Sequence, residues 1–176
     1  MTGRDRGSDV AVVAGSDSDA PLVKEAVDAL LELGISPVVR VLSAHRSPEE
    51  GGEFAAQARD AGYRVIIAIA GGAAHLAGAM AARTTLPVIG VPAPTKLAGG
   101  LDSLLSTVQM PAGVPVATVG VGRSGARNAG VLAAQILALN DEKIAEKLVR
   151  AKADMTREVH EKEGRLKDSL SAGETE

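Results

Sequence analysis

The chain has 176 residues, 45% of them hydrophobic and 23% charged, which is typical of a single folded domain rather than of a disordered chain. A formal net charge of −3 and an aromatic content of 1% leave it without the basic surface and the stacking side chains of nucleic-acid-binding proteins. The absence of cysteine excludes disulfides and thiolate metal sites. Since no apolar run approaches the roughly 18 residues of a membrane span and the N-terminal MTGRDRGSDV has no apolar signal core, we expect a cytoplasmic protein that binds no membrane.

Short apolar runs alternate with segments of helical spacing from Val10 onward, and glycine or proline marks most of the boundaries. Each pair predicts one βα unit. In chain order the expected elements are strand Val10–Ala14, helix Pro21–Leu33, strand Val38–Leu42, helix Ser47–Gly62, strand Val65–Ala70, helix Ala73–Arg83, strand Pro87–Ala93, helix Leu101–Val108, strand Pro115–Gly120 and helix Ser124–Leu139.

The start of the second helix has the pattern of a capping box. We expect the Ser47 hydroxyl to accept a hydrogen bond from the backbone N–H of Glu50, and Glu50 to reach back to the Ser47 N–H. Pro48 suits the first helical position.

Alternating strands and helices with short connections predict a parallel sheet with helices on both faces. The run Val65–Ala70 is apolar throughout, as expected of a strand covered on both sides. We therefore predict an α/β fold, a flavodoxin-like three-layer sandwich with a five-stranded parallel sheet in the order 2-1-3-4-5. Residues 1–140 would form this catalytic domain.

The pattern changes from Asp141 onward to a charged helix with one apolar stripe. A helix added to a finished α/β domain packs across that domain or on a neighbouring subunit, so we expect residues 141–176 to be a C-terminal extension that supports a homo-oligomer. The stripe consists of Ile144, Leu148, Ala151, Met155 and Val159.

Three polar loops, two of them with glycine, follow the first three predicted strands. They are GSDSD (15–19), SAHRSP (43–48) and GGAAH (71–75). In open α/β sheets, ligands bind beyond the carboxyl ends of the strands, so these loops should meet in one crevice.

The GSDSD loop could hold a phosphate, because Gly15 and the hydroxyls of Ser16 and Ser18 precede a helix. Asp17 and Asp19 would repel a phosphate and should turn to ribose hydroxyls or to helix capping. A plain capped turn explains the same residues, and the motif alone leaves both interpretations open.

The other two loops supply a cation and two histidines. Arg46 can hold a phosphate in a bidentate fork, and His45 can exchange protons near neutral pH. Gly71 and Gly72 permit close approach to a flat ligand, and His75, expected in the first turn of a helix, would act as a hydrogen-bonding rather than a charged group. A solvated loop and a buried capping histidine are the alternatives; convergence of three loops favours the functional interpretation.

Two other binding sites fit the sequence less well. The run GVGRSG (120–125) matches a dinucleotide fingerprint, but it follows the last strand and no second βαβ unit comes after it. Phe54 and Tyr63 lie away from the three loops, so no aromatic pair is placed to sandwich a flavin. With only scattered histidines, we expect neither a metal nor an organic cofactor, and a non-catalytic nucleotide- or flavin-binding module is the alternative of a different class.

Taken together, the motifs resemble the N5-carboxyaminoimidazole ribonucleotide mutase family of purine (IMP) biosynthesis, the class I PurE enzymes. The resemblance runs from Val10 to Leu139 through GSDSD, LSAHRSP, AGGAAHLAG, TTLPVIGVP, GLDSLLSTVQMPAGVPV and GARNAGVLAAQILAL. It implies a flavodoxin-like subunit of a homo-octamer that moves a carboxylate from the exocyclic nitrogen to C4 of an aminoimidazole ribonucleotide without metal, ATP or cofactor.

By the same resemblance, Ser16, Ser18 and Arg46 hold the 5′-phosphate, Asp19 binds the ribose and His45 carries the proton at C4. His75 and the backbone of Gly71, Gly72, Ala73 and Ala74 line the carboxylate pocket, and Gly15, Ser43 and Ala44 complete the substrate-binding set. The alternative within the family is the class II enzyme, which carboxylates aminoimidazole ribonucleotide directly with CO2; GGAAHL and VQMPAGVPV favour class I.

Overall fold

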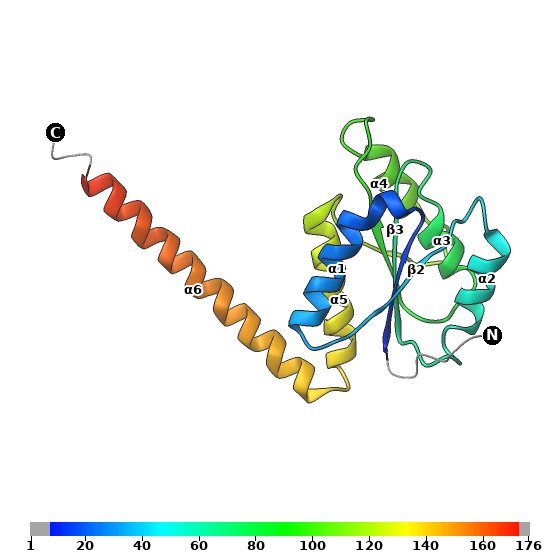
Figure 1. The fold of residues 1–176 in the computed structure, drawn as a ribbon, viewed down its shortest axis with the longest axis horizontal. Coiled ribbons are helices and arrows are strands. Elements are labelled where there is room, and N and C mark those ends of the chain that lie inside the picture. The colour runs from blue at the N-terminus through cyan, green and yellow to red at the C-terminus, as the bar shows by residue number, and fades with distance from the viewer. Residues whose placement is uncertain (1–7, 173–176) are drawn as a thin grey trace.

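Five parallel strands form one sheet in the computed structural model, which describes residues 8–172 (Figure 1). The strand order is β2-β1-β3-β4-β5, which confirms the predicted order and the predicted fold class. The strands are β1 (Val10–Ala14), β2 (Val38–Val41), β3 (Val65–Ala70), β4 (Val88–Pro92) and β5 (Ala117–Thr118).

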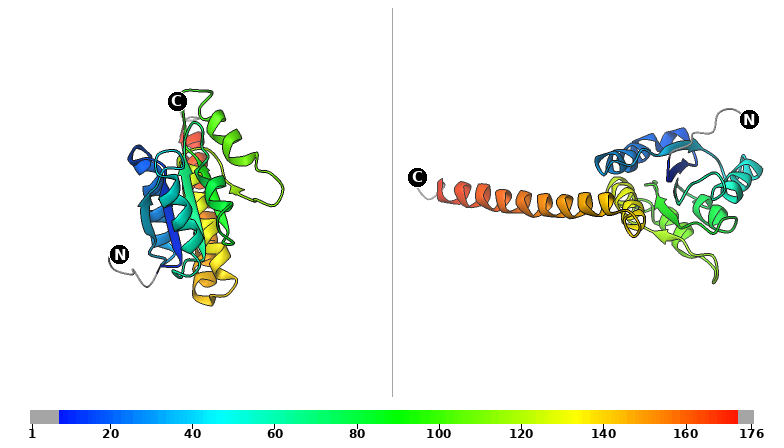
Figure 2. Two further views of the ribbon diagram at one scale, coloured as in Figure 1. Left: turned by 90° about the vertical axis from the view of Figure 1, so that its right-hand side faces the viewer. Right: turned by 90° about the horizontal axis from the view of Figure 1, so that it is seen from below.

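Helices cover both faces of the sheet (Figure 2). Alternate residues of a strand point to opposite faces, so Val10 and Val12 pack under α1 (Ala20–Glu32) and α5 (Arg123–Ala138). Ala11 and Val13 belong to the core on the other face, under α2 (Pro48–Gln57) and α3 (Leu76–Ala81).

Helix α4 (Leu101–Val108) lies on the same face as α3, directly over β4. A Cβ added at Gly90 of β4 would lie 2.4 Å from Cγ2 of Thr107, so the helix packs on bare backbone. This close approach holds α4 next to the carboxyl end of the sheet (Figure 1).

The predicted capping box at α2 is wrong. Ser47 is the N-cap residue, but its hydroxyl makes no capping bond to the helix. Instead it accepts from the backbone N–H of Ser43 at 3.0 Å and lies 3.3 Å from the Ser43 carbonyl oxygen, to which it donates. Because the Ser47 hydroxyl is bonded to Ser43 within the loop, it does not cap the N-terminus of α2. At the other end, α2 stops at Gln57, and hydrogen-bonded turns continue to Gly62, where we expected the helix itself to end.

The third helix and the last strand are also shorter than expected. The third helix begins at Leu76 rather than at Ala73, because the N–H groups of Ala74 and His75 donate to the carbonyls of Gly72 and Ala73 in successive tight turns. His75 is therefore the N-cap residue, not part of the first turn. Strand β5 has regular pairing only over Ala117–Thr118.

The C-terminal helix α6 (Glu142–Ala172) follows α5 after a short turn and leaves the domain (Figures 1 and 2). Ile144 is buried in the core, and Leu148 and Ala151 pack against it. Met155 and Val159 on the same stripe are 55% and 60% exposed. The predicted extension thus packs partly on its own domain; its tail beyond residue 172, like most of the N-terminal MTGRDRGSDV, lies outside the described residues.

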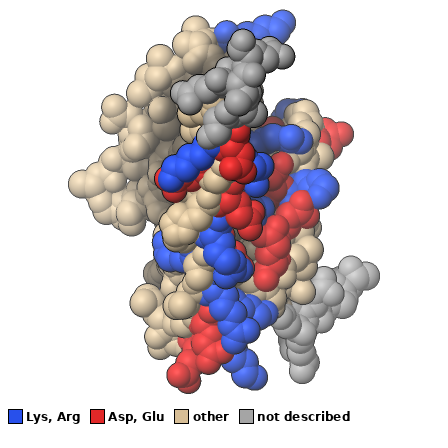
Figure 3. Space-filling model, turned by 90° about the vertical axis from the view of Figure 1, so that its left-hand side faces the viewer, with Lys and Arg blue, Asp and Glu red and all other residues tan. Residues whose placement is uncertain are grey.

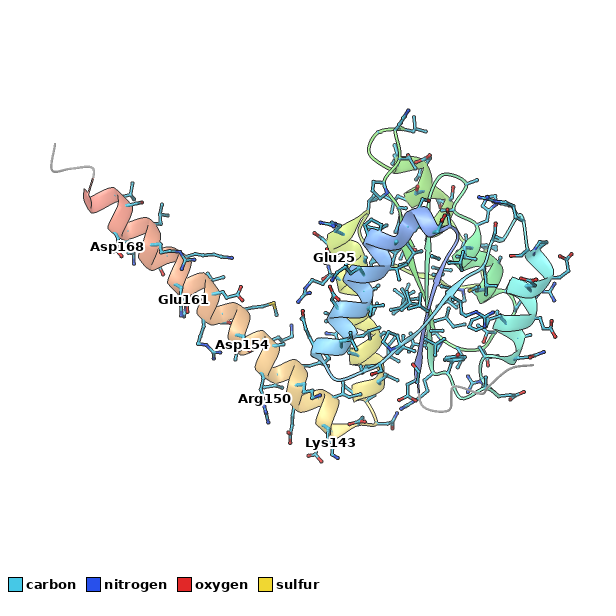
Figure 4. The ribbon with its side chains drawn as sticks, in the orientation of Figure 1. Glu25, Lys143, Arg150, Asp154, Glu161 and Asp168 are labelled. Carbon is cyan, nitrogen blue, oxygen red and sulfur yellow. The ribbon has the colours of Figure 1, made fainter. Side chains whose placement is uncertain are left out.

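Charged side chains of both signs lie along this helix, among them Lys143, Arg150, Asp154, Glu161 and Asp168 (Figure 4). Seen from the side of α6, Lys and Arg are interspersed with Asp and Glu and form no field of one sign (Figure 3). Within residues 8–172, no helix combines the length and the apolar character needed to cross a bilayer.

Candidate active site

A cavity of about 360 Å³ opens at the carboxyl end of the sheet, where the loops after β1, β2, β3 and β4 meet. Every sequence-predicted site residue except Gly72 and Ala74 lines it. The lining consists of Gly15, Ser16, Ser18, Asp19, Ser43, Ala44, His45, Arg46, Ala70, Gly71, Ala73, His75, Leu76, Ala93 and Pro94.

The loop after β1 presents two hydroxyls to this cavity. Ser16 caps a short 3-10 helix, Asp17–Asp19, by accepting from the backbone N–H of Ser18 at 3.3 Å. The Ser18 hydroxyl donates to Ser16 Oγ at 2.9 Å, so the two oxygens lie side by side. The Ser16 hydroxyl in turn donates to Asp17 Oδ1 at 3.2 Å, so both hydroxyls must rotate before they can donate to a bound ligand.

Asp19 lies in the same loop, half-buried at the cavity wall. Burial raises the pKa of its carboxyl and the neighbouring Asp17 carboxylate adds to the rise, while a hydrogen bond with the Ser16 backbone opposes it. A partly desolvated carboxylate gains by accepting hydrogen bonds from ligand hydroxyls.

The loop after β2 is a turn tied at both ends by serine hydroxyls. Ser43 Oγ accepts from the Arg46 N–H at 3.1 Å, and the Ser47 N–H donates to the Ser43 carbonyl at 3.0 Å. The turn leaves His45 and Arg46 exposed at the cavity. Among the described residues, no ion pair involves the Arg46 guanidinium, so no carboxylate competes with a ligand for its N–H donors.

The two cavity histidines are in direct contact. His45 Nε2 lies 2.8 Å from His75 Nδ1, and the rings meet edge to face at 73° with centroids 4.9 Å apart. At this distance one nitrogen carries the hydrogen and the other accepts it, so the contact holds a single proton. The pair is an exposed acid–base unit at the cavity wall.

The loop after β3 shows where the sequence expectations and the cavity differ. Gly71 and Ala73 line the cavity, but Gly72 and Ala74 between and beside them do not. The Gly72 N–H donates to Ser103 Oγ at 2.9 Å, and Ala74 is 1% exposed, so both residues face into the protein.

Sequence reasoning missed Ala93 and Pro94, which follow β4 and close one side of the cavity, and Ala70 and Leu76 at the ends of β3 and α3. These apolar side chains have no chemical signature in a sequence. The predicted strand order was the signal available, because it places the carboxyl end of β4 beside that of β3.

Within residues 8–172 no group of three or more histidine, aspartate and glutamate side chains is arranged to hold a metal ion. The polar and ionisable side chains that line the cavity are those of the histidine pair, Arg46, Asp19 and the serines.

The family model for AIR carboxylase matches residues 9–158, which include every residue of the cavity. The chain belongs to the AIR carboxylase family. The match includes the first half of α6, so this part of the C-terminal helix belongs to the family pattern together with the α/β sandwich.

Relatives of this family member share about half of its residues. The chain is 52% identical over 159 residues to the N5-carboxyaminoimidazole ribonucleotide mutase of Pyrococcus horikoshii, covering 90% of this chain and 89% of that protein. The protein of the same name from Bacillus subtilis is 57% identical over 139 residues, 79% of this chain and 86% of the relative. That from Thermotoga maritima is 52% identical over 157 residues, 89% and 91% of the two chains.

The fold is also that of a solved member. The crystal structure of Treponema denticola PurE superposes with a TM-score of 0.82 at 27% sequence identity and covers 90% of this chain and 98% of that one.

Proposed function

We propose that this protein interconverts N5-carboxyaminoimidazole ribonucleotide and 4-carboxy-5-aminoimidazole ribonucleotide, an isomerase step of purine biosynthesis. The observation that carries the proposal is the hydrogen-bonded pair His45–His75 in a cavity that Ser16, Ser18 and Arg46 also line. Relatives at 52% to 57% identity have the name of this mutase.

Binding uses the loops after β1 and β2. The hydroxyls of Ser16 and Ser18 and the guanidinium of Arg46 hold the 5′-phosphate, and Asp19 accepts hydrogen bonds from the ribose. A bidentate, charge-assisted contact from Arg46 is the strongest of these. The aminoimidazole ring then lies toward the loop after β3, against the backbone of Gly71 and Ala73.

The reaction is a balanced isomerisation. The bond between the exocyclic nitrogen and the carboxyl carbon breaks, its electrons stay on the nitrogen, which takes up a proton, and CO2 is released into the cavity. The electron-rich C4 then attacks CO2, and His45 removes the C4 proton, so one proton is delivered and one recovered per turnover. His75 assists by exchanging the proton that it shares with His45.

Confinement supplies much of the rate, because free CO2 would be lost to solvent. Holding the ring and CO2 in near-attack geometry makes the recarboxylation effectively unimolecular. The chemistry needs no redox agent or nucleotide cofactor, since substrate and product are isomers.

The deciding experiment is an assay of the purified protein with each of two substrates. We expect N5-carboxyaminoimidazole ribonucleotide to be converted without ATP. The name of the family, AIR carboxylase, points to a second candidate, direct carboxylation of aminoimidazole ribonucleotide by CO2. Turnover of that substrate with CO2, and none of the N5-carboxy isomer, would reject the mutase. A yellow purified protein that converts neither substrate would instead favour a flavin-binding module.

The protein is proposed to act in the cytoplasm as a homo-oligomer, an octamer by similarity to the family. Apolar side chains stay exposed on several elements of the single chain, as an assembling subunit requires. They are Val39, Val41, Leu97, Leu101, Leu105, Val108, Met155 and Val159. Light scattering on the eluted protein tests this: an octamer has eight times the 17.8 kDa mass of the chain, and a monomer contradicts the proposal.

A further inference from the structure

Helix α4 binds both polar backbone groups of Gly72. The Gly72 N–H donates to Ser103 Oγ at 2.9 Å, and the Gly72 carbonyl lies 3.3 Å from the Ser106 hydroxyl. The Ser106 hydroxyl shares its one hydrogen between this carbonyl and the Asp102 carbonyl at 2.8 Å, so the Ser103 contact is the stronger of the two. Residues three apart lie on one face of a helix, so the two serines form a clamp on a single residue of the loop after β3.

Gly72 occupies a left-handed conformation, with φ of 67°, between two residues that line the cavity. Its carbonyl also accepts from the N–H of Ala74 at 2.8 Å, in the tight turns that lead to His75. The orientation of Gly72 therefore determines how the backbone of Gly71 and Ala73 faces the cavity and where the backbone of His75 is placed.

The same helix holds the loop after β4. The Asp102 carboxylate accepts from the Thr95 hydroxyl at 2.6 Å and from the Ser103 N–H at 2.8 Å. The Thr95 hydrogen bond lowers the pKa of the Asp102 carboxyl, which stays ionised near neutral pH. Since Thr95 directly follows the cavity residues Ala93 and Pro94, α4 joins two walls of the cavity.

Burying the Ser103 hydroxyl has an energetic cost that an apolar side chain at the same position would avoid. Ser103 is 0% exposed, and a buried hydroxyl destabilises a protein unless it is hydrogen-bonded. Ser103 Oγ accepts a hydrogen bond from the N–H of Gly72, which lies 31 residues away in the chain. A buried alanine would fill similar space but would leave the Gly72 N–H without a partner.

We propose that Ser103 and Ser106 are positioning residues of the reaction. They hold the Gly71–Ala73 backbone so that a carboxylate or CO2 bound there stays aligned with the His45–His75 pair. This inference rests on the proposed isomerase function, because only that function puts CO2 against this backbone. Neither serine touches the ligand itself; neither lines the cavity.

The test compares Ser103→Ala and Ser106→Ala with Thr107→Val. Thr107 is a matched control, because its buried hydroxyl donates to the Ser103 carbonyl within α4 and does not contact the Gly72 loop. Ser106 is half-buried, so its variant folds even if Ser103→Ala does not.

We expect each serine variant to lower kcat by about 10-fold while KM for N5-carboxyaminoimidazole ribonucleotide changes less than about 2-fold. The phosphate and ribose contacts lie on other loops, so the loss should fall on the chemical step. Thr107→Val should leave both constants near those of the wild-type protein, whatever its effect on thermal stability.

A second readout does not depend on turnover. Amide hydrogen exchange at Gly72 should be at least about 10-fold faster in Ser103→Ala, while amides inside α4 keep their protection. Unchanged kcat in both serine variants, a rise in KM that accounts for the whole loss, or an equal loss in Thr107→Val would overturn the inference. A wild-type protein that does not convert the substrate would reject the proposed function instead.

Discussion

His45 Nε2 and His75 Nδ1 lie 2.8 Å apart, although thirty positions separate the two residues in the chain. His45 follows β2 and His75 follows β3, and β1 runs between these two strands in the sheet. The side chains therefore meet across the carboxyl end of β1, directly above the loop with Ser16 and Ser18. This contact links the two imidazoles by one hydrogen bond.

Removing either imidazole should impair the chemical step. We expect His45→Asn to lower kcat by about 1,000-fold, since asparagine cannot exchange a proton, and to leave substrate binding by calorimetry within a few fold. The double variant with His75→Asn should fall little below His45→Asn alone, because coupled residues act as a unit.

His160 provides the matched control for this series. It lies exposed on α6, outside the cavity, so His160→Asn should leave kcat and KM unchanged. Strictly multiplicative losses in the double variant would show that the two cavity histidines act independently.

Arg46 should affect binding more than chemistry. We expect Arg46→Gln to raise KM by about 10- to 100-fold and to change kcat much less, because a phosphate contact far from C4 is similar in the ground and transition states. Steady-state kinetics measure this, with the exposed Arg165→Gln on α6 as control. A fall in kcat with unchanged KM would place Arg46 at the reacting atoms.

The Asp19 carboxyl should lower the stability of the folded protein at neutral pH. Its carboxyl has a raised pKa in the folded protein, so the charged form is disfavoured there; the group's favourable contribution is present below the ordinary value of 3.8 and is lost as the pH rises through the folded-state pKa. Asp19→Asn should therefore raise Tm near pH 7 and lose this advantage as the pH approaches 3.8. Thermal unfolding followed across this range tests the sign, and a variant less stable at pH 7 would contradict it. The same variant should bind the ribonucleotide more weakly.

Two glycines with different surroundings test the packing of the helices. A Cβ at Gly130 in α5 would lie 2.7 Å from the Ala26 carbonyl oxygen in α1, so Gly130→Ala should destabilise the fold by about 1–3 kcal/mol. Gly164 in α6 has no atom within 4 Å of such a Cβ, and Gly164→Ala should stabilise the helix by about 1 kcal/mol. Denaturant unfolding measures the free energy of unfolding of both variants. If Gly130→Ala were no less stable than Gly164→Ala, α1 and α5 would be able to move apart to admit the extra methyl group.

Strand positions and strand order were predictable because they depend on short apolar runs and on the handedness of crossovers. Val10–Ala14 and Val65–Ala70 have the predicted bounds. The hydrogen bonds at the ends of helices were harder to predict from the sequence. Ser47 has the residue type and spacing of a capping residue, yet its hydroxyl bonds to Ser43, and the choice between two nearby partners depends on the path of the loop.

The reactive side chains were identifiable from their residue types and from the loops that contain them, because the order of parallel strands determines which loops meet. His45, His75, Arg46 and Asp19 all line the cavity. What the sequence determined by itself was this set of residues and the edge of the sheet at which they gather.

Only the tertiary structure decided which atoms of those loops face the cavity and which are bound from behind. Gly72 was expected among the lining residues, but Ser103 and Ser106 turn its polar groups toward α4. The direct contact of His45 with His75 likewise depends on side-chain distances across β1. Such contacts join residues about thirty positions apart, and their geometry depends on packing throughout the sheet rather than on any local pattern of residues.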